Sequence, residues 1–325
     1  MSPRRNQDVG DLVARARDGE SRAVARLVSM VEDGSPQLRE VMAALTPHAG
    51  HAQVVGVTGS PGVGKSTTTN ALVAELRKAG KRVGVLAVDP SSPFSGGALL
   101  GDRVRMQDHA TDPGVYIRSM ASRGHLGGLS WTTPQALRVL DAAGCDVVIV
   151  ETVGVGQSEV EIAGLADTTV VLMAPGLGDG VQAAKAGILE IGDLYLVNKA
   201  DRDGAEQVRR ELRSMIALGD RPEGGWKPPI VLTVAQSGRG LDEVVAELDR
   251  HRAWLEESGE LARRRTRRAR EEIEAIAVAG LRERWETASG APLSGGDLDA
   301  LAEAVVAGAK DPYAAADELV AAASG

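Results

Sequence analysis

The sequence contains a single cysteine, Cys145, among 325 residues. One cysteine excludes an internal disulfide and cannot build a thiolate metal cluster within one subunit, which is typical of a protein from a reducing cytosol. Cys145 itself is expected to be a small buried hydrophobic side chain beside an apolar strand. The chain is therefore predicted to fold without covalent cross-links.

Positive charge and long apolar runs are also scarce. Lys and Arg number 37 against 45 Asp and Glu, and the formal net charge of -8 repels nucleic acid and anionic membranes. No segment offers the ~20 apolar residues that a membrane span needs, and no apolar stretch follows the arginines of the N-terminal MSPRRNQDVGD. We therefore expect a cytoplasmic protein that binds neither nucleic acid nor membrane.

Short, valine-rich apolar runs follow residue 52 and lack clean alternation. Helix-length amphipathic segments such as 65–79 and 204–218 separate them, which is typical of strands buried on both faces. The sequence predicts an α/β fold with a doubly wound, mostly parallel sheet, whose ligands lie off the carboxyl ends of the strands. The runs are QVVGVT at 53–58, VGVLAVD at 83–89, VYIRSM at 115–120, DVVIVET at 146–152, TVVLMA at 169–174, LYLVNKA at 194–200 and IVLTVA at 230–235.

Helical segments flank the strand-rich region. Residues 1–50 are predicted to form an N-terminal helical extension, with helical spacing over 9–31 and a second helix starting at Ser35-Pro36. Residues 51–250 are predicted to form a strand-rich domain, which carries the motifs described below, and residues 251–325 are predicted to form a helical arm. In this arm, RRRTRRAR at 263–270 is followed at once by EEIE, which favours a solvated helix face with charge pairing over a docking site for an acidic partner.

The segment GSPGVGKS at 59–66 fits the phosphate-binding loop G-x-x-x-x-G-K-[ST], and it lies between an apolar strand and a helix. Its glycines let backbone N–H groups turn around phosphate oxygens, Lys65 supplies a cation to the terminal phosphates, and Ser66 offers a hydroxyl to Mg²⁺. The predicted nucleotide-binding residues of this loop are Gly59, Ser60, Pro61, Gly62, Val63, Gly64, Lys65, Ser66 and Thr67.

A second motif, ETVG, ends the strand DVVIV. In guanine-nucleotide switches the corresponding spacing is Asp-x-x-Gly, where the acid serves the magnesium site and the glycine N–H contacts the terminal phosphate. Glu151 is therefore a candidate metal-site residue, and Gly154 is predicted to bind nucleotide. The loop at 88–106, VDPSSPFSGGALLGDRVRM, resembles a switch region, and its Asp89 and Asp102 are further candidates for the Mg²⁺ site.

The third motif, NKAD at 198–201, indicates the base. In Asn-Lys-x-Asp the aspartate accepts hydrogen bonds from N1–H and the exocyclic amine of guanine, and adenine presents no such donor pair. Asn198, Lys199 and Asp201 therefore predict GTP. Ala235, Gln236 and Ser237 follow the last strand. In such proteins the backbone N–H groups at this place wrap around the base.

In this order the motifs make the chain resemble the MeaB/ArgK-type P-loop GTPases, the family that includes the mitochondrial methylmalonic-aciduria type A protein. The resemblance covers nearly the whole chain, and its implied fold is that of P-loop NTPases. It implies a GTPase chaperone that gates adenosylcobalamin loading of a B12-dependent acyl-CoA mutase, usually methylmalonyl-CoA mutase, and removes inactivated cofactor. The matching segments are TGSPGVGKST, VDPSSPFSGGALLGDRVRM, IRSMASRGHLGGLS, ETVGVGQSE, APGLGDGVQAAKAGILEI, NKAD and DPYAAADEL.

The resemblance also assigns roles to residues. Lys65 and Ser66 would hold phosphate and Mg²⁺, Asp89 and Asp102 would join the metal site, and Glu151 would act in hydrolysis.

Further roles implied by the resemblance concern partners. The segment 175–187, which contains Asp179 and Lys185, would be a third switch that senses the mutase, and the arm from about residue 251 would form a homodimer. No glutamine stands at the usual water-orienting position after ETVG, so we expect slow intrinsic turnover that a partner raises.

Other interpretations stay open. Nickel-insertion GTPases share this fold but need cysteine and histidine ligands, and the histidines here are scattered except for His48 and His51. A small-molecule kinase would use ATP, which NKAD does not favour. A nucleotide-gated binding module without turnover would differ from a slow GTPase only in hydrolysis.

Overall fold

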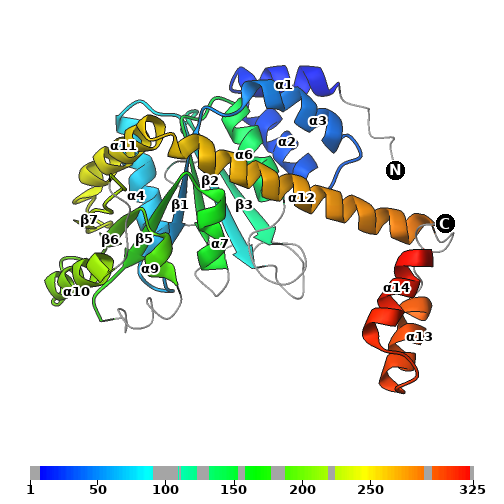
Figure 1. Cartoon of the computed structure of the whole chain (residues 1–325). Helices are drawn as coiled ribbons and strands as arrows, with labels where there is room; N and C mark the ends of the chain where they lie inside the picture. Colours follow the sequence, from blue (N-terminus) through cyan, green and yellow to red (C-terminus); the bar gives the residue numbers. More distant parts are fainter. Residues whose placement is uncertain are drawn as a thin grey trace. The chain divides into compact units, whose positions relative to one another are not determined.

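The computed structural model describes residues 8–90, 109, 111–122, 132–152, 158–176, 187–218, 224–288 and 295–322. These residues form a seven-stranded sheet in the order β3-β2-β4-β1-β5-β6-β7, with every pairing parallel (Figure 1). The predicted doubly wound parallel sheet is thus confirmed. The strands are β1 Gln53–Thr58, β2 Val83–Pro90, β3 Val115–Ser122, β4 Val147–Thr152, β5 Thr168–Met173, β6 Leu194–Val197 and β7 Ile230–Leu232.

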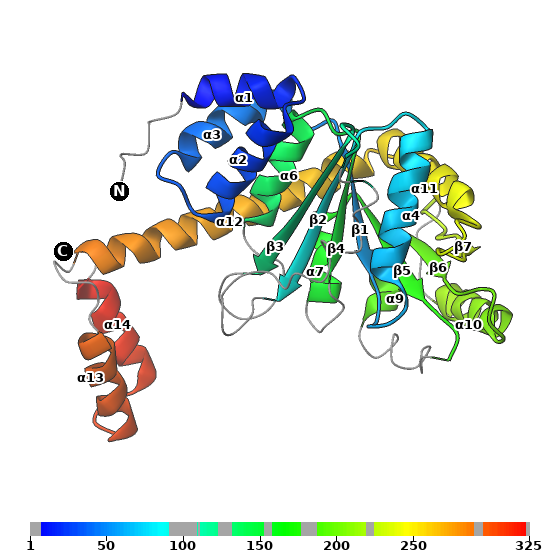
Figure 2. The same cartoon turned by 180° about the vertical axis from the view of Figure 1, so that it is seen from behind.

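Helices cover both faces of this sheet. Figure 1 shows α7 in front of the strands with α4 behind them, and Figure 2 shows the reverse view. The helices among the described residues are α1 Val9–Arg17, α2 Ser21–Glu32, α3 Leu38–Leu45, the 3-10 turn η1 Thr46–His48, α4 Lys65–Lys78, α6 Thr133–Ala142, α7 Ser158–Leu165, α9 Ile188–Ile191, α10 Ala205–Leu218, α11 Leu241–Glu257, α12 Glu260–Ala288, α13 Gly295–Val306 and α14 Pro312–Ala322.

The central strands β1, β4 and β5 are buried at every position and are mostly apolar, because helices cover both of their faces. On β4, Val148 and Val150 join the hydrophobic core shared with α6 and α7, whereas Val147 and Ile149 join the core shared with α4 and α11. Side chains alternate between the faces of a strand with a period of two, so a strand between two helix layers shows no polar alternation. This burial explains the valine-rich runs of the sequence.

Strands β6 and β7 end earlier than the apolar runs that predicted them. β6 ends at Val197, and Lys199 then adopts a left-handed backbone conformation with φ 56° that cannot continue a strand. β7 ends at Leu232, and Val234 instead forms an isolated antiparallel bridge with Arg239. Two polar segments, 198–201 and 235–237, therefore lie in loops after these strands, at the carboxyl edge of the sheet.

The N-terminal extension consists of three helices rather than the two that were predicted. The predicted first helix is interrupted at Gly19, which has a φ of 88° and separates α1 from α2, and α3 begins after Ser35-Pro36, at Leu38. The apolar faces of these helices share one hydrophobic core with α6. Arg118 of β3 also pairs with Glu32 of α2. These contacts attach the extension to the β3 side of the sheet.

The described chain separates into two compact units, one up to Thr266 and one from Arg267 onward. The domain division predicted from the sequence stays a prediction. The expectation that the arginine run at 263–270 forms a solvated helix face is wrong for Arg264 and Arg265, because both side chains are 21% exposed and form ion pairs with buried aspartates. No helix within the described ranges is both long and apolar enough to cross a membrane.

Candidate functional site

The phosphate-binding loop connects the end of β1 to the start of α4, and two of its glycines have no tolerable substitute. Gly59 has a φ of 138°, and a Cβ there would lie 2.3 Å from the carbonyl oxygen of Leu172. Gly64 is the N-cap of α4 with a φ of 99°, and a Cβ there would lie 2.6 Å from the side-chain amide of Asn198. Both the left-handed backbone and the close contacts require glycine.

The amino end of α4 is open to an anion. Its N-cap residue is Gly64, which has no side chain that could cap the first N–H groups of the helix. These N–H groups and the positive end of the helix dipole favour a phosphate at this position. Lys65 is 7% exposed, and its ammonium donates hydrogen bonds to the carbonyls of Gly59 at 2.5 Å and Ser60 at 3.2 Å. The lysine charge is thus held against the same loop.

Glu151 and Ser66 meet across the carboxyl edge of the sheet. Glu151 lies on β4, opposite Val57 of β1, and only 4% of it is exposed. The Ser66 hydroxyl donates a 2.6 Å hydrogen bond to Oε1 of Glu151. A hydroxyl and a carboxylate supply the oxygen ligands that Mg²⁺ prefers, so these two groups fit the metal that the sequence predicts.

The other predicted metal ligands and switch residues are described only in part. Asp89 lies on β2, one residue beyond Val88, which pairs with Thr152 of β4. This register brings the Asp89 backbone to the strand ends where Glu151 lies. The predicted residues Asp102, Gly154, Asp179 and Lys185 lie outside the described residues.

Asn198 joins the predicted base-binding loop to the phosphate-binding loop. Its side chain is 3% exposed, its Nδ2 donates to the carbonyl of Val63 at 2.9 Å, and its Oδ1 accepts hydrogen bonds from the Ala235 N–H at 3.1 Å and the Thr233 hydroxyl at 3.3 Å. Lys199 adds a second link, because its ammonium donates to the carbonyl of Gly62 at 2.6 Å. The two loops are therefore bonded to each other.

The remaining candidates for base recognition differ in what they offer. Asp201 is exposed, and so is Gln236. The Ala235 N–H, which was predicted to face the base, instead donates to Asn198. The Ser237 hydroxyl donates to the Val234 carbonyl at 3.2 Å. The sequence did not predict the contact of the Thr233 hydroxyl, which donates to Asn198, or those of the Gly62 and Val63 carbonyls, because no motif marks these groups.

A cavity of about 710 Å³ lies at the opposite, amino-terminal edge of the strands. Its lining mixes charges of both signs, including Arg17, Lys81, Asp146 and Asp249. Cys145 also lines it, and burial raises the pKa of this thiol to about 12, so it behaves as the small buried side chain that was predicted. The cavity and the loops of the candidate nucleotide site are thus at different edges of the sheet.

The chain is similar to several known proteins over most of its length. A model of the family described as "Methylmalonyl Co-A mutase-associated GTPase MeaB" matches residues 24–289. A Pyrococcus horikoshii protein named as a GTPase is 48% identical over 313 residues, which cover 96% of this chain and 97% of that protein. The Escherichia coli GTPase ArgK is 38% identical over 260 residues, which cover 78% of each chain.

Two further comparisons concern a mammalian protein and a solved structure. The mitochondrial methylmalonic aciduria type A homolog of Mus musculus is 40% identical over 214 residues, which cover 65% of this chain and 52% of that protein. The crystal structure of an LAO/AO transport system kinase has a TM-score of 0.72 and 27% identity, and the match covers 98% of both chains.

Proposed function

Because this chain belongs to the MeaB family of methylmalonyl-CoA mutase-associated P-loop GTPases, we propose that it is a nucleotide-driven chaperone of an adenosylcobalamin-dependent acyl-CoA mutase. It binds GTP with Mg²⁺, hydrolyses GTP slowly, and uses the nucleotide state to gate cofactor loading and to protect or reactivate the mutase. The hydrogen bond between Ser66 and Glu151 carries the chemical part of this proposal, because it joins the phosphate-binding loop to a buried carboxylate.

Guanine is read by the exposed carboxylate of Asp201. It accepts hydrogen bonds from N1–H and the exocyclic amine, which adenine cannot supply as a pair. Asn198 and Lys199 support this reading by holding the loop against Val63 and Gly62. Base and phosphates are therefore bound by two loops that act as one site.

The phosphates are bound by the N–H groups at the start of α4 and by the ammonium of Lys65. Bound Mg²⁺ supplies charge neutralisation to the terminal phosphates. Ser66 and Glu151 would hold this metal, and the Glu151 carboxylate would also orient the attacking water as a hydrogen-bond acceptor. Without a water-orienting glutamine after ETVG, turnover is slow until a partner completes the site, and such completion commonly raises rates by ~10³ or more.

The partner of the C-terminal unit is a second copy of this chain. Large apolar side chains are exposed on α12 and on the two helices that follow it, including Ile273 at 67%, Leu281 at 58%, Val306 at 89% and Tyr313 at 84%. Apolar surface of this kind in a short helical segment marks a protein interface. The homodimer that the resemblance implies would bury these side chains.

The test is GTP hydrolysis at fixed protein concentration, with and without a cobalamin-dependent acyl-CoA mutase from the same source. A rise in turnover with the mutase, absent from a Lys65→Ala variant, supports the chaperone function. Unchanged turnover, with GTP still preferred over ATP, contradicts the mutase partner and leaves the GTPase intact. The cytoplasmic location predicted from the sequence stays a prediction.

A further inference from the structure

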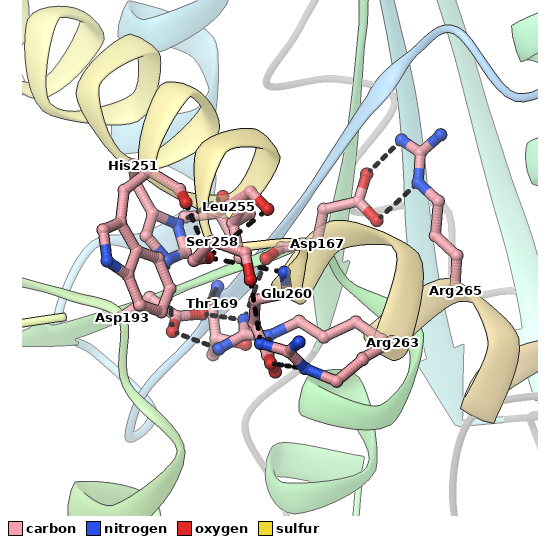
Figure 3. A network of polar contacts seen from close by, with 12 residues as sticks. Asp167, Thr169, Asp193, His251, Leu255, Ser258, Glu260, Arg263 and Arg265 are labelled. Carbon is pink, nitrogen blue, oxygen red and sulfur yellow. Dashed lines mark hydrogen bonds and ion pairs between the residues drawn. The ribbon is translucent and has the colours of Figure 1, made fainter. Parts of the chain in front are cut away.

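Two arginines at the start of α12 lie at the amino-terminal edge of the sheet, opposite the candidate nucleotide site. Arg265 donates to both carboxylate oxygens of Asp167, at 2.7 and 3.2 Å (Figure 3). It also donates to the carbonyls of Gly50 at 2.5 Å and Ala52 at 2.8 Å. Asp167 is completely buried. All of these acceptors lie immediately before β1 or β5.

Arg264 makes a second bidentate pair beside the first. It donates to Asp193 at 2.8 and 2.9 Å and to the carbonyl of Asp167 at 2.9 Å. Asp193 is 7% exposed and directly precedes β6. We call Arg264 and Arg265 the arginine pair. Planar guanidinium groups suit such two-point contacts with carboxylates, and lysine cannot reproduce the geometry.

Each aspartate also bonds a neighbouring strand. Asp167 accepts a hydrogen bond from the Val54 N–H of β1 at 3.0 Å, and Asp193 accepts one from the Thr169 N–H of β5 at 2.9 Å. The first aspartate therefore ties β5 to β1, and the second ties β6 to β5. Arg264 and Arg265, which belong to α12, bond these same two aspartates, so the helix is attached to all three strands.

These three strands carry the candidate nucleotide site at their other ends. β1 leads into the phosphate-binding loop at Gly59, and β6 leads into the base-binding loop at Asn198. β5 lies between them in the sheet, so no backbone ladder joins β1 to β6 directly. The 2.9 Å hydrogen bond from Asn198 to Val63 requires the two strand ends to keep a fixed offset. The arginine pair fixes that offset at the opposite edge.

We propose that Arg264 and Arg265 are positioning residues of the nucleotide site: they hold the amino ends of β1, β5 and β6 in register, and guanine-nucleotide affinity depends on them. The proposal rests on the function proposed above for the identity of the nucleotide. It also gives the first turns of α12 a role in binding, although Arg264 and Arg265 donate to residues that precede β1, β5 and β6 and not to the described parts of the loops that would contact GTP.

The test measures nucleotide affinity and stability separately. Arg264→Met and Arg265→Met remove the bidentate contacts, and Arg263→Met is the matched control, because Arg263 is 65% exposed and pairs with Glu260 on the same helix. The dissociation constant of a fluorescent GDP analogue is measured well below each variant's unfolding temperature. We expect about a fivefold or larger increase for the two variants, within the usual range of coupling between sites, and no change for the control.

A purely structural role would give a different pattern. Lower melting temperatures with unchanged affinity for GDP and GTP would overturn the proposal. Arg265→Lys adds a conservative comparison, since it keeps the positive charge but cannot make the two-point contact with the Asp167 carboxylate. The affinity of this variant for GDP should lie between that of the unchanged chain and that of Arg265→Met. If the unchanged chain binds no guanine nucleotide, the proposed function fails and this inference fails with it.

A second measurement needs no variant and stays informative if the variants do not fold. Hydrogen exchange of the unchanged full-length chain is followed with and without GDP. The N–H groups of Val54 and Thr169, which bond the two aspartates, should exchange more slowly with GDP bound, because coupling between two sites is reciprocal. Protection confined to the phosphate-binding and base-binding loops would contradict the inference.

Discussion

The side-chain amide of Asn198 donates a 2.9 Å hydrogen bond to the backbone carbonyl of Val63, 135 residues earlier in the chain. Its carbonyl oxygen accepts two more bonds, from Thr233 and Ala235. One buried amide thus joins the phosphate-binding loop, the end of β6 and the loop after β7. A base and its phosphates can be bound at a defined separation only if these loops hold together.

Asn198→Asp should weaken this junction. The substitution replaces the donor to Val63 with an oxygen, so two acceptors face each other at a buried position. A buried carbonyl without its partner costs ~1–3 kcal/mol. We expect the unfolding free energy to fall by about that amount in urea titrations and GDP and GTP affinity to fall together. Unchanged affinity for both nucleotides would show that the loops do not depend on this contact.

Asp201→Asn should change the base that is preferred. Guanine offers two donors to the carboxylate, and an amide presents one donor and one acceptor instead. Xanthine has a carbonyl where guanine has its exocyclic amine, so it fits the amide better. We expect GTP affinity to fall by about tenfold or more, because the amide leaves one of the two guanine donors without an acceptor, and XTP affinity to rise. The neighbouring Asp203→Asn is the control, and equal losses in both variants would contradict the assignment of Asp201.

Glu151→Gln should separate binding from turnover. The glutamine keeps an oxygen within reach of the Ser66 hydroxyl but loses the negative charge. Nucleotide binding in the absence of Mg²⁺ should be preserved, whereas single-turnover GTP hydrolysis should fall by about 10²-fold or more, the usual effect of removing one acid–base group. Glu243→Gln, on the exposed side of α11, should leave both unchanged. A variant that hydrolyses GTP at the original rate would remove Glu151 from the reaction.

Substitutions on α12 should separate the homodimer. Ile273→Asp with Leu281→Asp places two charges on side chains that are 67% and 58% exposed in the single chain. Because an apolar interface does not tolerate unpaired charge, sedimentation should detect monomers for this double variant and dimers for the unchanged chain. Leu218→Asp is the control, since Leu218 is 86% exposed and lies outside the C-terminal unit. Monomers in all three samples would contradict the homodimer.

His251 should make stability fall at acid pH. The pKa of His251 is lowered from 6.5 to about 4, mainly because the ring is buried; Arg264 contributes to the lowering, whereas Asp193 and Asp167 oppose it. Between these two values the unfolded chain binds a proton that the folded chain does not. The contribution of His251 to stability is therefore complete above pH 6.5 and is lost as the pH falls toward 4, by about 3 kcal/mol at most.

The measurement for His251 is the urea midpoint as a function of pH. Other groups titrate in the same range, so the comparison is between the unchanged chain and His251→Gln. The variant should be less stable at pH 7, because the 2.9 Å contact of His251 with Thr168 is lost, but its stability should fall less between pH 6.5 and 4. Parallel pH curves would show that His251 does not titrate on unfolding.

The sequence predicted most of the sheet and the loops at its carboxyl edge. The phosphate-binding loop, ETVG and NKAD are local patterns, in which a few neighbouring residues define both the backbone and the chemistry. Boundaries were predicted less well, as at Gly19, where a left-handed residue divides one apparent helix into α1 and α2. Whether a glycine inside a helical pattern ends the helix depends on what packs around it, and one sequence does not contain that information.

The sequence by itself determined the sheet, the motifs and their order along the chain, because apolar strands and glycine loops are set by residues close in sequence. Only the tertiary structure decided which distant groups meet. It placed the Ser66 hydroxyl within hydrogen-bond distance of Glu151, and it directed the Ala235 N–H to the side chain of Asn198. It also turned Arg264 and Arg265 inward to aspartates that lie about 70 to 100 residues earlier in the chain. Charge alone could not predict this burial, because an arginine is buried only where a fold supplies a carboxylate to pair with it.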